Sequence, residues 1–361
     1  MFSNIYNGKK VLITGDTGFK GSWLALWLLE LGADVYGYAL SPERDDDNFV
    51  VCGLETMFHH SDGDIRDLKS LLQMFEKIQP DIVFHLAAQS LVLDSYNNPH
   101  ETFSTNLMGT VNVFEAVRLT SSVKAAINVT SDKCYQNNEW IWGYRENDPM
   151  GGKDPYSASK GASEIITSSY ITSFFSDDST ASVASVRAGN VIGGGDWAEN
   201  RIVPDYFRAK KTNTELVVRN PNATRPWQHV LEPLSGYMYL ASRLYSEGKT
   251  LQGGWNFGPR DTMNQTVAEL IKEIVKHDSN TDVVYDNSED NLEANLLKLD
   301  ISKAVSKLHW MPVLDFGETV KVTAESYLSD LTGNSAEDNR LKTIRSYTKT
   351  AQNRKISWAL N

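Results

Sequence analysis

Apolar positions along the chain alternate between two spacings. Short apolar runs rich in β-branched residues begin near residues 11, 81, 124 and 182, and the last three read "DIVFHLAA", "KAAINVTS" and "SVASVRAG". Stretches with helical spacing separate them, such as "SLLQMFEKI" and "TFSTNLMGTVNVFEAVRLT". This alternation is typical of parallel strands whose two faces are covered by helices. We therefore predict an α/β fold built on a Rossmann-type, doubly wound parallel sheet.

The domain organisation changes where this pattern loosens. After about Asn190, glycine, proline and tryptophan gather in "GGGDWAENR", "RNPNATRPW" and "GGWNFGPRD". We predict a dinucleotide-binding domain with the catalytic residues over 1–190. A smaller mixed α/β domain over 191–335 should mainly bind substrate and interleave with the last sheet strands. A polar tail over 336–361 carries six basic residues that we expect on a solvated helix face or a frayed end, namely Arg340, Lys342, Arg345, Lys349, Arg354 and Lys355.

Composition argues against several classes of function. Hydrophobic residues make up 41% of the 361 residues, and no apolar run approaches the ~18 residues of a membrane span. The amino terminus shows no secretory signal, so we expect a cytoplasmic protein with no membrane partner. A formal charge of −11 disfavours nucleic-acid binding. Cys52 and Cys134 are too few for a disulfide framework, and the seven histidines show no paired ligand spacing, so we predict no metal site.

A glycine turn follows the first strand. In "TGDTGFKG", Gly15, Gly18 and Gly21 lie at intervals of three before a helix that carries Trp23 and Trp27. Glycines at this spacing allow a tight turn and bring backbone N–H groups up to a pyrophosphate. An ordinary strand-to-helix turn is the competing interpretation, but a first-strand position within a βαβ unit favours a dinucleotide site.

The ends of the next two strands bear on the choice of dinucleotide. "DVYGYALSPER" lacks the acidic residue that holds the ribose hydroxyl of NAD, and Arg44 there could accept the 2′-phosphate of NADP, so this segment leaves NADP open. "DGDIRD" places Asp64 after the expected third strand. Its carboxylate could accept a hydrogen bond from an adenine amino group, or it could simply form a turn.

A donor and acceptor triplet ends the "KAAINV" strand. Ser131, Asp132 and Lys133 come directly after buried apolar residues. Proton-transfer residues at the carboxyl edge of a parallel sheet lie where substrates bind in such folds. A solvated strand-end loop is the competing interpretation.

A tyrosine and a lysine lie one turn apart in "DPYSASKGASE", where the proline marks a helix start. Tyr156 and Lys160 therefore share one helix face, and the ammonium group, with a nearby nicotinamide, would lower the pKa of the phenol so that it can take a proton from an alcohol. The spacing recurs at Tyr6 and Tyr206, so context must select the pair. A plain helix-surface pair is the alternative.

These motifs resemble those of a known family. "TGDTGFKG", "HLAAQ" at 85–89, "STNLMGT" at 104–110 and the pair Tyr156 and Lys160 are similar to the extended short-chain dehydrogenase/reductases. Within that family, "TSDKCY", "GYRENDPMGGKDPYSASKG", "RAGNVIGGGDW", "RPWQHVLEP" and "GGWNFGP" resemble the nucleotide-sugar 4,6-dehydratases, in particular the CDP-glucose branch. The resemblance covers nearly the whole chain.

The resemblance implies a redox-neutral lyase of deoxysugar biosynthesis that uses bound NAD to turn CDP-glucose into its 4-keto-6-deoxy product and water. It implies that Ser131 binds the sugar 4-oxygen, Tyr156 deprotonates it, and Asp132 protonates the leaving 6-hydroxyl. Lys133 stands where dTDP-glucose and GDP-mannose relatives carry a glutamate base. A neutral lysine could serve as that base, or the cation could stabilise the enolate.

The resemblance also implies the contacts of both ligands. Residues expected at the cofactor are Gly15, Thr17, Gly18, Phe19, Lys20, Gly21, Asp64, Ile65, Leu86, Ala87, Ala88, Tyr156 and Lys160. Residues expected at the nucleotide sugar are Gln89, Asn106, Asn190, Arg201 and Arg225. Trp227 and Trp255 could stack on a base or sugar, although burial in the core is the commoner role of tryptophan. Leu296 stands where the CDP-glucose branch often has tyrosine, which leaves base recognition open.

Several alternatives stay open at this point. They are a dTDP- or UDP-glucose 4,6-dehydratase, a nucleotide-sugar epimerase, a net dehydrogenase, and a non-catalytic cofactor sensor with the same fold. The family pairs two long helices of each subunit, which implies a homodimer through "TFSTNLMGTVNVFEAVRL" and "YSASKGASEIITSSYITSFF". Further pairing of such dimers into a tetramer stays open.

Overall fold

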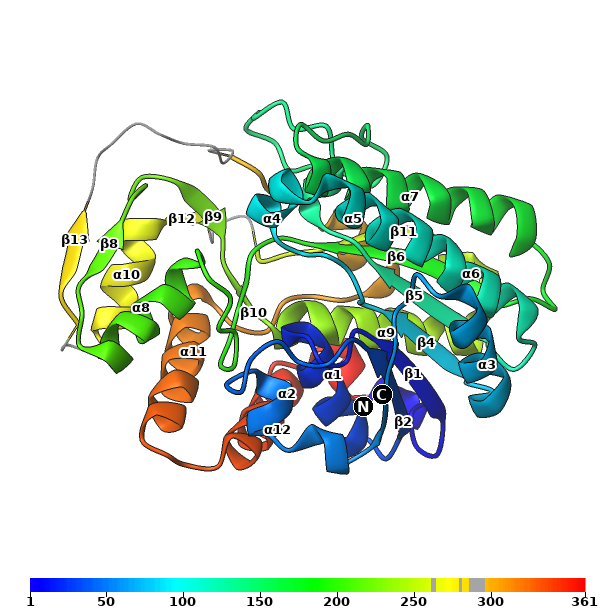
Figure 1. Cartoon of the computed structure of the whole chain (residues 1–361), viewed down its shortest axis with the longest axis horizontal. Coiled ribbons are helices and arrows are strands. Elements are labelled where there is room, and N and C mark those ends of the chain that lie inside the picture. The colour runs from blue at the N-terminus through cyan, green and yellow to red at the C-terminus, as the bar shows by residue number, and fades with distance from the viewer. Residues whose placement is uncertain (261–263, 279–280, 286–295, 361) are drawn as a thin grey trace.

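A computed structural model describes residues 1–260, 264–278, 281–285 and 296–360 (Figure 1). Its centre is a seven-stranded sheet in the order β11-β6-β5-β4-β1-β2-β3, and every neighbouring pair in it is parallel. The strands are β1 Lys10–Thr14, β2 Asp34–Ala39, β3 His59–Asp62, β4 Ile82–His85, β5 Ala125–Val129, β6 Ser182–Ala188 and β11 Gly253–Phe257. The order reverses between β1 and β4, which is the switch point of a doubly wound sheet. The predicted fold class is confirmed.

Helices cover both faces of this sheet, so its central strands are buried on both sides. One core joins the sheet to α1 Phe19–Glu30 and α9 Leu231–Glu247. The other joins it to α3 Leu68–Ile78, α6 Gly109–Leu119 and α7 Pro155–Phe174. Burial on both faces explains why these strands read as apolar runs without alternation.

A smaller mixed region lies beside the carboxyl ends of the strands (Figure 1). It contains three two-stranded sheets and three helices around a third core. Its strands are β7 Val191–Ile192 with β10 Gln228–His229, β8 Leu216–Val218 with β13 Val283–Tyr285, and β9 Thr224–Pro226 with β12 Asn264–Thr266. Its helices are α8 Ile202–Thr212, α10 Val267–Val275 and α11 Phe316–Leu331.

Short helical segments connect these elements. Two of them are π-helical turns, η3 Ser104–Met108 and η7 Ala304–Leu308. The α-helical segments are α2 Asn48–Val51, α4 Val92–Asn97, α5 Pro99–Phe103 and α13 Ser357–Leu360. The 3₁₀ segments are η1 Phe2–Asn4, η2 Leu54–Thr56, η4 Asp132–Cys134 and η5 Gly248–Leu251.

The polar tail is more deeply integrated than we expected. Residues 336–353 form helix α12, which packs against α1 and α11. Lys342, Arg345 and Lys349 are exposed, as a solvated helix face requires. The expectation for Arg340 is wrong, because its side chain is 0% exposed and pairs with Asp330 at 2.5 Å. The sequence did not reveal that Asp330 on α11 would pair with this arginine and allow its burial.

Candidate functional site

The glycine turn is built by close approach of backbone segments. Gly15 has φ +81°, and a Cβ there would lie 2.6 Å from the backbone nitrogen of Ala87. A Cβ on Gly21 would lie 2.0 Å from the carbonyl oxygen of Gly15, whereas one on Gly18 would meet nothing nearer than 3.4 Å. Larger residues would therefore open the turn at Gly15 and Gly21, whereas a Cβ on Gly18 would make only an ordinary van der Waals contact. This is the cradle that a pyrophosphate needs at a helix start.

The rest of the expected cofactor segment converges on the same edge. The hydroxyl of Thr17 donates to the carbonyl of Leu40 at the end of β2. Leu86 and Ala87 follow β4, where the Leu86 amide donates to Thr14. Ile65 is buried and packs where a Cβ on Gly109 would stand. Phe19 and Lys20 begin helix α1, and Ala88 continues the loop after β4.

Asp64 and Arg44, which we expected near the adenosine part of the cofactor, each pair with a neighbouring side chain. Arg66 binds both carboxylate oxygens of Asp64, the shorter contact being 2.6 Å, and this lowers the pKa of Asp64. The guanidinium group of Arg44 lies 3.1 Å from Asp46. A 2′-phosphate at Arg44 would have to compete with this carboxylate.

Sequence reasoning missed a buried pair beneath the turn. Asp16 is 0% exposed and binds the Nδ1 atom of His60 on β3 at 2.7 Å. Its other oxygen has no hydrogen-bond partner among the described residues. The hydrogen bond to Asp16 raises the pKa of His60. The residue type at position 16 was visible in the glycine motif, but its partner lies 44 residues away and only the sheet brings them together.

The triplet after β5 forms a buried turn, not a solvated loop. The hydroxyl of Ser131 donates to Asp132 at 3.0 Å and accepts from the backbone amide of Lys133 at 3.2 Å. Burial raises the pKa of Asp132, while the charge of Lys133 and the bond from Ser131 act in the opposite direction. Asp132 therefore holds a proton more readily than a surface aspartate does.

Tyr156 and Lys160 lie in the first turns of α7, beside this turn. Pro155 begins the helix, and Asp154 caps it by accepting from the amide of Ser157 at 2.9 Å. Both side chains are buried, and the ammonium group of Lys160 lies 3.5 Å from the carbonyl oxygen of Val129. Burial lowers the pKa of Lys160 to about 8, and the charge of Lys20 adds to this.

The pKa of Tyr156 differs from our expectation. We expected the neighbouring ammonium group to lower this pKa. Burial has the largest effect instead and raises the pKa of Tyr156 to about 12, although the hydrogen bond to Ser131 acts in the opposite direction. The other two candidate tyrosines serve the core. The hydroxyl of Tyr6 donates to the carbonyl of Met238, and that of Tyr206 to the carbonyl of Asp278.

Residues expected at the substrate lie around the same edge. Asn106, on the π-helical turn η3, accepts from the amide of Gln89 at 2.9 Å and donates to its carbonyl at 3.0 Å. Asn106 therefore holds the loop after β4, and the side-chain oxygen of Gln89 is left without a hydrogen-bond partner among the described residues. Arg201 pairs with Asp196 at 2.8 Å, and the charge of Arg225 acts on Asp132.

A small pocket opens next to Asp132. A Cβ on Gly189 would lie 3.1 Å from the carboxylate of Asp132 and 3.2 Å from the side chain of Pro226. Gly189 and Pro226 also line the pocket, together with Gly258, Pro259, Arg260, Lys298 and Leu299. Asn190 follows Gly189 at the end of β6. Sequence reasoning did not single out Arg260 or Lys298, which bring positive charge to this pocket from segments after β11 and before α11.

The remaining candidates take core positions. Trp227 and Trp255 are 4% and 1% exposed, as expected for core tryptophans, and His229 is buried against Trp23. Within the described ranges, no cluster of three or more histidine, cysteine or acidic side chains could hold a metal ion. In those same ranges no helix is long and apolar enough to cross a membrane.

Comparison with known proteins places this arrangement in a family. The family model described as GDP-mannose 4,6 dehydratase matches residues 12–323. The CDP-glucose 4,6-dehydratase of Salmonella typhimurium is 49% identical over 88% of this chain and 90% of its own length. An epimerase structure from Methanothermobacter thermautotrophicus is 24% identical, covers 96% of each chain and superimposes with a TM-score of 0.78. A Bacillus anthracis dTDP-glucose 4,6-dehydratase structure with NAD is 18% identical, covers 91% of this chain and 99% of its own, and has a TM-score of 0.74. Because this family model spans most of the chain and a dehydratase relative is 49% identical over nearly its full length, the chain belongs to the GDP-mannose 4,6 dehydratase family.

Proposed function

We propose that the protein is a CDP-glucose 4,6-dehydratase, which converts CDP-D-glucose into CDP-4-dehydro-6-deoxy-D-glucose and water. The observation that carries this proposal is the turn of Ser131, Asp132 and Lys133 beside Tyr156 and Lys160, in which Ser131 and Asp132 are buried and Lys133 is half-buried. An epimerase or a dehydrogenase needs one proton-transfer residue at the sugar hydroxyl, whereas a dehydratase also needs an acid for the leaving hydroxyl and a base or cation at carbon 5. The 49% identity to a CDP-glucose enzyme supports cytosine as the nucleotide base of the substrate.

The cofactor of this proposal is NAD. The cradle formed by Gly15, Gly18 and Gly21 fits a pyrophosphate, and the pairing of Arg44 with Asp46 favours NAD over NADP. Lys160, which faces the carboxyl edge of β5, would hold the nicotinamide ribose. When bound, NAD would supply the redox chemistry, in which a hydride leaves carbon 4 of the sugar and is later returned at carbon 6.

Tyr156 would take the proton of the sugar 4-hydroxyl, with Ser131 holding the same oxygen. Because burial raises the pKa of Tyr156 to about 12, the phenol needs positive charge nearby before it can act as a base at neutral pH. Lys160 and a bound nicotinamide would supply that charge. Tyr156 would therefore stay protonated in the free protein and become a base once NAD and the sugar are bound.

Asp132 and Lys133 would carry out the elimination. The raised pKa of Asp132 suits a general acid that gives a proton to the departing 6-hydroxyl. Lys133 would act at carbon 5, either as the base that removes the proton or as a cation beside the enolate. Its position one residue from Asp132, on the same buried turn, allows either role.

The diphosphate of the nucleotide would lie near the small pocket beside Asp132. Arg225 acts electrostatically on Asp132, and Arg260 and Lys298 line the pocket, so positive side chains gather where a diphosphate would bind. Asn190, Arg201 and the side-chain oxygen of Gln89 would complete the sugar and phosphate contacts. This concentration of positive charge accommodates an anionic substrate on a chain whose formal charge is −11.

Mass spectrometry tests the whole proposal. Purified protein with NAD and CDP-glucose in deuterated water should form a product that has lost water and gained one solvent deuteron at carbon 5. Reduced cofactor should not accumulate at turnover. Product that retains the 6-oxygen, or a stoichiometric rise in reduced cofactor, would identify an epimerase or a net dehydrogenase. Parallel reactions with dTDP-glucose, UDP-glucose and GDP-mannose identify the preferred base.

We also propose a cytoplasmic homodimer. Large apolar side chains are exposed on α4, α5, η3, α6 and α7, which lie together on one side of the molecule (Figure 1). They are Tyr96, Phe103, Met108, Leu119, Ile165 and Phe174. Pairing of these helices with a second copy would cover this face. Light scattering of wild type and of an Ile165→Glu variant would test it, with a shift from dimer to monomer expected for the variant.

A further inference from the structure

A buried ion pair lies directly behind the proposed catalytic turn. Glu164 follows Lys160 by one turn on α7, and Arg187 lies on β6. Their charged atoms are 2.6 Å apart, and both side chains are only 4% exposed. Neither residue lines the pocket beside Asp132. The proposed reaction gives the pair no chemical step.

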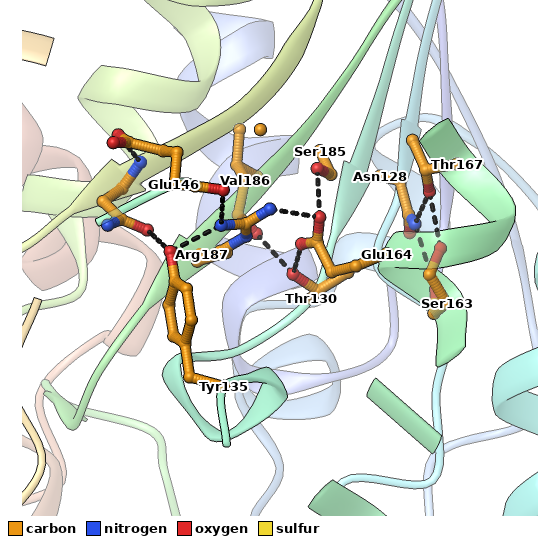
Figure 2. Close-up of polar contacts among 12 residues, drawn as sticks. Asn128, Thr130, Tyr135, Glu146, Ser163, Glu164, Thr167, Ser185, Val186 and Arg187 are labelled. Atoms are coloured by element: carbon orange, nitrogen blue, oxygen red, sulfur yellow. Dashed lines mark hydrogen bonds and ion pairs between the residues drawn. The ribbon is translucent and has the colours of Figure 1, made fainter. Parts of the chain in front are cut away.

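Both oxygens of the Glu164 carboxylate accept hydrogen bonds. Thr130 donates to one oxygen, and Ser185 and Arg187 donate to the other, each at 2.6 Å (Figure 2). Burial alone would raise the pKa of Glu164, but the ion pair and these hydrogen bonds hold it below its ordinary value. Thr130 immediately precedes Ser131, so this carboxylate holds the first end of the turn.

The guanidinium group of Arg187 holds the other end. It donates to the hydroxyl of Tyr135 at 2.5 Å and to the carbonyl of Glu146 at 3.3 Å, and it lies over the Tyr135 ring at 5.0 Å (Figure 2). The hydroxyl of Tyr135 in turn donates to Asn256 at 2.8 Å. Tyr135 directly follows the segment Asp132–Cys134.

We infer that Glu164 and Arg187 are positioning residues, which fix the catalytic turn at Thr130 and Tyr135 and tie both ends to the helix that carries Tyr156 and Lys160. A buried pair of this kind seldom adds net stability, because desolvation offsets the attraction, but it holds its hydrogen-bonded neighbours in one arrangement. The inference rests on the proposed function, since the geometry at issue is that of the elimination.

Glu164 also acts on Lys160 through its charge. The groups that face Lys160 are Lys20 on α1, His85 on β4, Cys134 on the turn and Glu164 on its own helix. Burial lowers the pKa of Lys160 most and the charge of Lys20 lowers it further, whereas Glu164 and Cys134 raise it. Loss of the negative charge should lower that pKa further. Since the reaction needs the ammonium form of Lys160, activity should then disappear at a lower pH on the alkaline side.

Three variants test the inference. Glu164→Gln removes the charge, and Thr130→Val removes one hydroxyl and keeps the charge. As a control, Asp330→Asn removes the charge that pairs with the buried Arg340, where α11 meets α12. We expect Glu164→Gln and Thr130→Val to lower kcat for CDP-glucose dehydration roughly 10–100-fold with little change in KM, because small displacements of reacting groups have effects of this size. The alkaline limb of the kcat profile should move to lower pH in Glu164→Gln and stay in place in Thr130→Val.

The measured kcat values and pH profiles distinguish a positioning role of the ion pair from a purely structural one. If the control loses as much kcat as the two test variants, or if the alkaline limb stays unchanged in Glu164→Gln, the pair is merely structural and the inference is wrong. Should Glu164→Gln fail to fold, Thr130→Val still decides the positioning role, because unchanged kcat there would contradict it. A wild-type protein inactive on CDP-glucose contradicts the proposed function as well, whereas an active wild type with control-like variants contradicts this inference alone.

Discussion

Tyr156 and Tyr206 each precede a lysine by four positions on a helix, yet their hydroxyl groups have different surroundings. Tyr156 lies beside Ser131, and Tyr206 donates to the carbonyl of Asp278 in the smaller region. We expect Tyr156→Phe to lower kcat by about 10²–10⁴-fold, the range typical of a lost general base. Tyr206→Phe should keep kcat and cost about 1 kcal/mol of stability for one lost hydrogen bond. Equal kcat values for the two variants would contradict the assignment. Initial rates and thermal unfolding measure both.

Lys133 can be assigned by separating charge from basicity. Lys133→Arg keeps a cation that cannot lose its proton at working pH, and Lys133→Met removes both properties. If Lys133 stabilises an enolate, the arginine variant should retain exchange of the carbon 5 proton with deuterated water, and the methionine variant should lose it. Loss in both variants would identify Lys133 as the base. Nuclear magnetic resonance of the sugar signals follows the exchange.

Single residues show how far sequence reasoning reaches. The triplet at 131–133 and the pair Tyr156 and Lys160 were predictable, because each lies within a few positions and next to a recognisable strand or helix end. Asp16 with His60, and Glu164 with Arg187, were not, because the partners lie 44 and 23 residues apart. Only tertiary packing, of the turn after β1 near β3 and of α7 against β6, brings such side chains together.

The glycine turn is the element on which cofactor binding depends. A Cβ on Gly21 would lie 2.0 Å from the carbonyl oxygen of Gly15, whereas one on Gly317, in helix α11, would meet nothing nearer than 3.6 Å. We expect Gly21→Ala to abolish NAD binding by calorimetry, because the turn must open to admit the methyl group. Gly317→Ala should leave binding unchanged and stabilise the protein by roughly 0.5–1 kcal/mol. NAD binding by Gly21→Ala at wild-type affinity would show that the cradle is not needed.

Some helices and turns could be predicted from the sequence and others could not. The start of α7 was predictable from Pro155, and the structure adds a cap from Asp154. The π-helical turn at Ser104–Met108 was not, because it interrupts a segment whose helical spacing continues through it. That turn carries Asn106, whose two hydrogen bonds to Gln89 depend on tertiary packing.

Across the whole molecule, Glu232 is a buried acid that links three segments. Its carboxylate accepts from the backbone amides of Val313 and Leu314 and from the hydroxyl of Tyr347. Burial raises the pKa of Glu232 to about 7, from an ordinary value of 4.5. The folded state therefore keeps a proton that the unfolded chain has already lost between these two values.

The sign of the pH dependence follows from this difference. Stability linked to Glu232 is fully present below about pH 4.5 and is lost as the pH rises through about 7. The loss is on the order of 3 kcal/mol. Glu232→Gln removes the titration, so the wild type should lose more stability than this variant between pH 5 and 8 in denaturant unfolding. Parallel pH curves for the two proteins would refute the prediction.

The distribution of helices over the sheet was predictable at this scale, because continuous apolar strands need cover on both faces. The route of residues 336–360 was not. Their basic residues suggested solvent, but Arg340, Tyr347 and Trp358 are buried where α12 and α13 meet the rest of the core. The average hydropathy of a segment does not show a narrow apolar stripe, because only every third or fourth side chain of a helix needs to face inward.

The stack of Phe2 on Trp358, with ring centroids 5.1 Å apart, joins the beginning and the far end of the described chain against Trp27 of α1. Residues 336–360 are synthesised after the other described segments, so the outer side of α1 stays uncovered until they have left the ribosome. Nascent chains arrested before Trp358 should therefore expose the Trp27 surface to proteases and holding chaperones. The cofactor turn at the start of the same helix should reach its final rigidity only after translation has passed that point.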